Sequence, residues 1–110
     1  MARGSRFAEP KEVTVRLTPA AEADVEATLE WYGERGPELG EQFRQAFERS
    51  LELIQENPRS GPKVHGEIRR ALLRRFPYCI FYIVEGDEVI VLGCLHGHRD
   101  PRRWKTRRDA

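Results

Sequence analysis

YCIFYIVEGDEVIVLGCL, residues 78–95, is the stretch that decides the fold. Two apolar segments, 78–84 and 88–95, are rich in β-branched and aromatic residues, which is typical of buried strands. Between them stands Glu85-Gly86-Asp87, a short polar sequence with the glycine that tight hairpin turns require. The stretch therefore predicts an antiparallel β-hairpin at the centre of the protein.

The turn also predicts a register for this hairpin. If Gly86-Asp87 forms a two-residue loop, Glu85 faces Glu88. Counting back along the pair then places Cys79 opposite Cys94. These are the only two cysteines of the chain, and we expect free thiols that pack as small apolar side chains.

Residues 68–76, IRRALLRRF, precede the hairpin and read as a third strand, after an irregular connection over 59–66. Arginines alternate with apolar residues on both faces of this predicted strand. Arg69 and Arg75 share one face with Ala71 and Leu73. The mixed pattern leaves open which face of the strand is buried.

Two amphipathic helices precede this region. The first opens at Thr18-Pro19, a good capping pair, and carries an apolar stripe of Ala21, Val25, Leu29 and Tyr32. Gly33 and Gly36-Pro37 interrupt it, and a second helix is expected over 38–56, ending at Asn57-Pro58. The alternating segment VTVRL, residues 13–17, predicts a short strand before both helices.

The resulting order is β-α-α-β-β-β, which predicts the α+β class, with a helical hairpin packed on a small, largely antiparallel sheet. A chain of 110 residues suits one domain. We expect that domain over residues 13–104, with a flexible N-terminal arm over 1–12 and a basic tail over 105–110.

Charge is unevenly divided along the chain. Residues 1–60 hold 8 basic and 12 acidic side chains, a net of −4, whereas residues 61–110 hold 11 and 6, a net of +5. This asymmetry favours two faces with different partners, because a basic face attracts phosphates or acidic protein segments. No apolar run is long enough for a membrane span or a secretory signal, so we expect a cytoplasmic protein.

Several enzyme classes lack their usual signatures in this sequence. No serine lies in a nucleophile elbow, and no glycine-rich phosphate loop occurs. His96, His98 and Asp100 alternate, but no Cys/His cluster accompanies them, so we expect no metal site and no cofactor.

Metal-independent RNA cleavage is the chemistry that the residue types do allow. It needs a base for the 2′-hydroxyl proton, an acid for the leaving oxygen and cations for the phosphorane. His96 can supply the base or the acid, and the phosphate can be held by Arg69, Arg75 and Arg99. The alternative is a solvated arginine face, with His96 merely ending a strand.

Binding without chemistry is the other possibility for LHGHRDPRRW, residues 95–104. Basic side chains crowd this segment around Trp104, and guanidinium groups can reach phosphates while an indole stacks on bases. The same segment suits an acidic partner peptide. A solvated basic tail is the remaining alternative, above all for residues 105–110.

The chain resembles the ParE/RelE-superfamily toxins of type II toxin–antitoxin modules, also called plasmid stabilization proteins. The resemblance covers about residues 13–104 and rests on the order of its motifs: Thr18-Pro19 with Ala20-Ala21, Asn57-Pro58, Gly61, Arg69, FPYCIFY at 76–82, VEGDEVIVL at 84–92 and LHGHRDPRRW at 95–104. Phe-Pro-Tyr before an aliphatic–aromatic–Tyr strand, and His-Gly-x-Arg-Asp, look most like the ParE branch.

The resemblance implies a helical hairpin on a small twisted sheet, and a cognate antitoxin whose C-terminal segment wraps the toxin in a hetero-oligomer. ParE-like members act on DNA gyrase, whereas RelE-like members cut mRNA in the ribosomal A site, and one fold serves both outcomes. RelE-type nucleases tend to carry an arginine just before the Tyr-ending strand motif, here Ile80-Phe81-Tyr82. This chain has Cys79 there, and a thiol cannot replace a fixed guanidinium.

We therefore expect a non-enzymatic gyrase inhibitor rather than a nuclease. The residues expected to contact the target or the antitoxin are Arg69, His96, Arg99, Asp100 and Trp104. Asp100 could instead pair with Arg99 or Arg69 and shape the turn, and Tyr82 is expected in the core. The alternatives are a ribosome-dependent mRNA endonuclease and a module that only binds its antitoxin and has lost toxicity.

Overall fold

The computed structural model describes residues 12–97. In chain order its elements are β2 (Thr14–Leu17), α1 (Pro19–Arg35), α2 (Pro37–Glu56), β3 (Lys63–His65), β4 (Ile68–Leu72), β5 (Tyr78–Glu85) and β6 (Glu88–His96). The five strands form one sheet in the order β2-β6-β5-β4-β3, in which β2 runs parallel to β6 and the other pairs are antiparallel. This architecture confirms the predicted α+β class.

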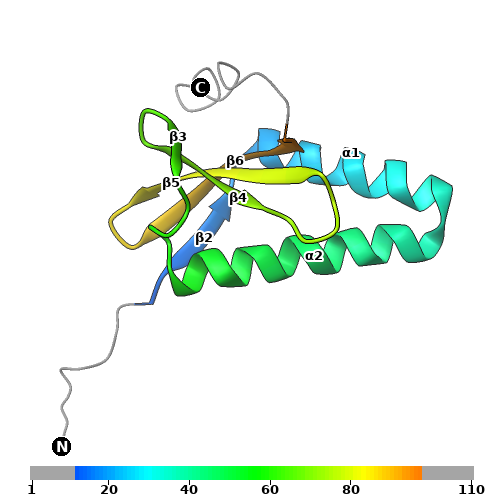
Figure 1. The fold of residues 1–110 in the computed structure, drawn as a ribbon, viewed down its shortest axis with the longest axis horizontal. Coiled ribbons are helices and arrows are strands. Elements are labelled where there is room, and N and C mark those ends of the chain that lie inside the picture. The colour runs from blue at the N-terminus through cyan, green and yellow to red at the C-terminus, as the bar shows by residue number, and fades with distance from the viewer. Residues whose placement is uncertain (1–11, 98–110) are drawn as a thin grey trace, which may run out of the picture.

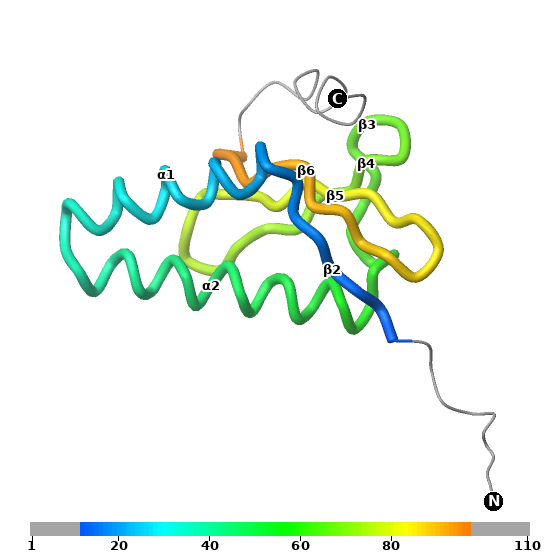
Figure 2. Tube along the Cα trace, turned by 180° about the vertical axis from the view of Figure 1, so that it is seen from behind, coloured from blue at the N-terminus to red at the C-terminus, as the bar shows by residue number. Residues whose placement is uncertain are grey.

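The two helices form an antiparallel pair on one face of the sheet, and Figure 2 shows them side by side from behind. Thr18 caps α1, because its Oγ1 accepts a hydrogen bond from the backbone N–H of Ala21 at 3.1 Å. Gly36 ends α1 and also precedes Pro37, the first residue of α2. The link between the two helices and the β5–β6 turn lie at opposite ends of the molecule (Figure 1).

The predicted hairpin is confirmed at its turn but not along its length. Glu85 pairs with Glu88 as expected, and Gly86 adopts the positive φ of 59° that favours glycine. Farther along, Phe81 pairs with Gly93 but Tyr82 pairs with Val91, so Leu92 is an extra residue in a β-bulge.

The bulge makes the predicted pairing of Cys79 with Cys94 wrong. Cys79 pairs with Leu95, and Cys94 pairs with Ile80. A shift of one residue turns a side chain to the other face of a sheet. The two cysteines accordingly belong to apolar clusters on opposite faces, and both are buried free thiols.

The region before the hairpin also differs from the sequence prediction. The connection over 59–66 contains the short strand β3, which pairs with the start of β4. The strand predicted over 68–76 ends at Leu72, and the residues after it form the turn into β5, in which Arg75 adopts the left-handed region with φ of 71°. Phe76 consequently joins the aromatic core under the helices instead of continuing the alternation of a strand.

The sheet is apolar on both faces. The larger cluster lies between the sheet and the helices and includes Phe43, Ile80 and Tyr82, which confirms Tyr82 as a core residue. The smaller cluster on the other face includes Ile68, Phe81 and Leu92. Neither helix within residues 12–97 has the length and hydropathy needed to cross a bilayer.

Candidate functional site

Three of the residues expected at the site fall within the described chain: Arg69, Arg75 and His96. Arg99, Asp100 and Trp104 lie outside the described residues. The expected roles of these last three residues therefore remain predictions.

Arg69 is held by the loop that joins α2 to β3. Its Nη1 donates hydrogen bonds to the carbonyl oxygens of Arg59 at 2.9 Å and Gly61 at 2.7 Å. Its cross-strand neighbour Tyr82 donates from its hydroxyl to the carbonyl of Pro58 at 2.8 Å. Arg69 makes no ion pair with a carboxylate within residues 12–97, so its charge is fixed in place by carbonyls and is not neutralised there.

His96 ends β6 and borders an aromatic cluster beneath the helices. It pairs with Tyr78, and the two rings meet edge to face with centroids 5.7 Å apart. Tyr78 in turn contacts Tyr32 and Phe43. Burial, and the neighbouring Tyr78, raise the pKa of the Tyr32 hydroxyl above its ordinary value, so Tyr32 stays protonated and neutral in this cluster.

The fold separates Arg69 from His96. Their partners Tyr82 and Tyr78 are four residues apart along β5, which corresponds to about 13 Å. The two residues also flank β5 from opposite sides, which adds about 10 Å across the sheet. The two side chains therefore start from opposite ends of the sheet.

Arg75 lies at the same end of the sheet as His96. The turn that carries Arg75 leads into β5 beside the end of β6, where the N–H of Gly97 donates to the carbonyl of Pro77 at 3.0 Å. The structure thus places Arg75 and His96 near one sheet end, and Arg69 at the other.

Cys79 occupies the position where RelE-type nucleases tend to have an arginine. Its side chain is fully buried on the sheet face away from the helices. Burial raises the pKa of the Cys79 thiol, an effect that nearby Arg70 partly offsets. A buried neutral thiol supplies no positive charge for a phosphate.

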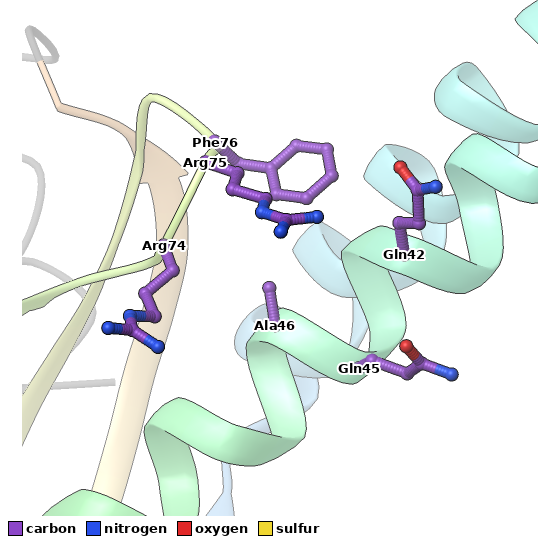
Figure 3. A pocket seen from close by; sticks show the side chains of 6 residues that line it. All are labelled: Gln42, Gln45, Ala46, Arg74, Arg75 and Phe76. Atoms are coloured by element: carbon purple, nitrogen blue, oxygen red, sulfur yellow. The ribbon is translucent and has the colours of Figure 1, made fainter.

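A cleft between α2 and the turn after β4 was not predicted from the sequence. Its volume is about 220 Å³, and its lining residues are Gln42, Gln45, Ala46, Arg74, Arg75 and Phe76 (Figure 3). The sequence prediction had placed both arginines in a continuous strand. The available signal was Pro77, since a proline disfavours a regular strand and restricts the residue before it.

Comparison with known proteins assigns this fold to a family. The family model for the ParE toxin of the type II toxin–antitoxin system, parDE, matches residues 15–101 of the sequence. The chain belongs to the ParE toxin family. No curated relative matches the chain.

Two solved structures share the fold of this ParE-family chain. A chain from the chromosomal ParDE toxin–antitoxin system of P. aeruginosa is 24% identical, with a TM-score of 0.69 over 77% of this chain and 96% of that chain. A chain from the RelBE2 toxin–antitoxin complex of Mycobacterium tuberculosis is 20% identical, with a TM-score of 0.52 over 78% of this chain and 99% of that chain. At these identities the likeness concerns the fold alone.

Proposed function

We propose that this ParE-family toxin inhibits DNA gyrase and is neutralised by a cognate antitoxin in a toxin–antitoxin complex. The family match over residues 15–101, and the fold shared with chains of two toxin–antitoxin systems, support the toxin and antitoxin part of this proposal. A gyrase inhibitor acts in the cytoplasm, where its target and the DNA are. It needs binding surface rather than a reacting group of its own.

The buried Cys79 is the observation that favours gyrase over mRNA. A phosphodiester can be cleaved without metal only if cations hold the charge that develops on the phosphorane. The position before Ile80-Phe81-Tyr82 offers a buried, neutral thiol instead of a guanidinium. This departure removes one phosphate contact that the nuclease branch of the superfamily uses.

The separation of Arg69 from His96 supports the same choice. A general acid or base must lie within hydrogen-bond reach of the proton it transfers, and the phosphate clamp must reach the same group. β5 lies between these two residues, about 13 Å separate them along the strand, and the Arg69 guanidinium is bound to the carbonyls of Arg59 and Gly61, so the two side chains are held apart rather than converging on one phosphodiester. Of the arginines predicted to hold the phosphate, Arg75 is the only other one within residues 12–97. It lies near the same sheet end as His96, so only one of the two described arginines is near the candidate acid or base.

In this proposal Arg69, His96, Arg99, Asp100 and Trp104 form contacts with gyrase or the antitoxin. Arg69 suits that role because its guanidinium is positioned by two carbonyls and has no carboxylate partner within residues 12–97. His96 suits it because its ring lies at the rim of the aromatic cluster.

Induced expression in a bacterial host, with an SOS reporter and mapping of mRNA ends in the same cultures, tests the proposal. Gyrase trapped on DNA leaves breaks, so we expect growth arrest with SOS induction and no new mRNA ends. His96→Gln removes a general acid or base but keeps a side chain that can donate and accept hydrogen bonds at the contact surface, so we expect SOS induction to persist with at most a modest loss. Ribosome-dependent cuts that vanish in His96→Gln would overturn the proposal in favour of a nuclease.

A further inference from the structure

The cleft between α2 and the turn after β4 adjoins a second hollow along α2. The second hollow, of about 40 Å³, has Ala46 and Arg74 in common with the first, and its other lining residues are Arg49, Ser50, Leu53 and Leu72. We call the two hollows together the α2–turn groove. None of its residues belongs to the gyrase or antitoxin contacts proposed above, and Arg75 entered the argument only as a nuclease candidate.

One half of the groove is basic. Arg74 and Arg75 are exposed neighbours in sequence, and neither forms an ion pair within residues 12–97. In Figure 3 the Arg75 side chain reaches from the turn toward Ala46 on α2, next to the Phe76 ring, whereas the Arg74 side chain points away from Arg75. Two unneutralised guanidinium groups at a cleft that Gln42 and Gln45 also line suit carboxylate or phosphate oxygens.

The backbone of the turn is held in an unfavourable conformation. Arg75 has a φ of 71° and is the only non-glycine residue with positive φ within residues 12–97. A left-handed conformation is costly for a residue with a Cβ, and such strain collects at binding sites. Glycine would adopt it without strain, so the arginine side chain is retained at a cost to stability.

The other half of the groove is apolar. Four large apolar side chains are exposed within residues 12–97, and two of them, Leu53 at 45% and Leu72 at 66%, line the second hollow. Exposed leucines grouped in a hollow are typical of contacts with a protein segment. Leucine side chains form no hydrogen bond or ion pair with the phosphates of a nucleic acid.

The acidic side chains nearby also argue against a nucleic acid. On α2, Glu41 and Glu48 flank the groove and are both engaged by Arg44. A polyanion lying along α2 would approach these carboxylates, whereas a peptide can present its own carboxylates only at Arg74 and Arg75.

We propose that the α2–turn groove binds an acidic, aliphatic peptide segment of a partner protein. Its carboxylates bind Arg74 and Arg75, and an aliphatic side chain packs between Leu53 and Leu72. That this segment comes from the antitoxin rests on the function proposed above, but the chemical preference of the groove does not.

Selection from a random dodecapeptide display library tests this preference. The full chain is the bait, and the Arg74→Glu/Arg75→Glu variant is used for counter-selection. We expect enriched peptides with Asp or Glu close to Leu, Ile or Phe. Their dissociation constants should rise about tenfold or more in the double variant and to a similar degree in Leu72→Ala.

Two further variants guard against trivial loss of binding. Arg59→Glu reverses the charge of a single exposed arginine beyond the C-terminal end of α2 and should leave peptide affinity unchanged. Arg75→Gly should lower affinity without lowering Tm, because glycine relieves the strained backbone.

Three results would overturn the proposal. The first is that every selected peptide binds the double variant as well as it binds the wild type. The second is that the enriched peptides contain no acidic residues. The third is that a labelled DNA duplex binds the wild type through Arg74 and Arg75 and the peptides do not compete with it. None of these results depends on gyrase, so failure here is distinguishable from failure of the proposed function.

Discussion

Gly61 is the position where a single methyl group should do most damage. It lies in the loop between α2 and β3, packed against β4 and β5. A Cβ there would lie 2.7 Å from the carbonyl oxygen of Arg70 and 2.5 Å from the Tyr82 hydroxyl. Neither neighbour can give way, since one is strand backbone and the other is a fully buried ring with its hydroxyl bonded to Pro58.

The expected cost of Gly61→Ala follows from these contacts. Forcing a methyl into a well-packed site costs about 1–3 kcal/mol. Displacing the Tyr82 hydroxyl from Pro58 adds about 1–2 kcal/mol for a partly buried carbonyl left without a donor. The free energy of unfolding should therefore fall by about 2–5 kcal/mol, and Tm by at least about 10 °C. Because the Gly61 carbonyl accepts from Arg69, the guanidinium should also lose its fixed position.

Thermal and urea unfolding of four variants, Gly61→Ala, Tyr82→Phe, the combination of these two, and Gly33→Ala, would measure this effect. Gly33→Ala is the matched control, because a Cβ at Gly33 meets nothing within 4 Å and lies inside α1, where alanine is favoured by about 0.5–1 kcal/mol. Gly61→Ala combined with Tyr82→Phe should cost less than the sum of the single changes, because the hydroxyl clash is removed. A Gly61→Ala variant as stable as wild type would refute the steric reasoning.

Three further changes have expected outcomes. Burial raises the pKa of the Cys94 thiol to about 12 from an ordinary value of 9.0, so the thiol stays protonated in the folded state while the unfolded state loses its proton. The free energy of unfolding should thus fall as pH rises from about 9 toward 12, by up to about 1.4 kcal/mol per pH unit for this group, and Cys94→Ala should flatten the slope in urea titrations. Asp24→Ala removes the carboxylate that accepts a hydrogen bond from the N–H of Cys94 at 3.1 Å and should lower the free energy of unfolding by about 1–3 kcal/mol. Asp24→Asn keeps an acceptor and should lower it less. Faster amide exchange at Cys94 in Asp24→Ala, but not in Asp24→Asn, would support the assignment. Arg75→Gly should raise stability by up to about 1 kcal/mol in thermal unfolding, and a lower Tm would show that the turn is not strained.

The local signals in the sequence were sufficient for most of the fold. Thr18-Pro19 begins a helix because the hydroxyl cap and the fixed φ of proline act within one turn of the chain. The β5–β6 turn is equally local, since its glycine supplies the positive φ. These features could be predicted because the residues that cause them are neighbours in sequence.

The missed features depend on contacts between distant segments. The bulge at Leu92 accompanies a hydrogen bond from Cys94 to Asp24, 70 residues away, and only the isolated Gly93 hinted at it. The early end of β4 depends on Phe76 packing against Phe43 of α2, which no alternation within the strand reveals.

In the candidate site, too, the residue types could be predicted from local sequence, whereas their arrangement in space could not. Residue types at the end of β6 and on β4 pointed to His96 and Arg69. Their separation, however, requires the register of both strands against β5. The α2–turn groove could not be predicted, because it forms only where the turn carrying Arg75 comes back beside α2.

Inhibition of purified gyrase tests the central proposal most directly. Relaxed plasmid, gyrase and ATP are incubated with the purified toxin, and the products are separated with and without protein denaturation. We expect supercoiling to fall as toxin is added, with linear DNA appearing after denaturation, and Arg69→Ala to require more toxin for the same effect. Unchanged supercoiling at toxin in excess over gyrase would contradict the proposed function.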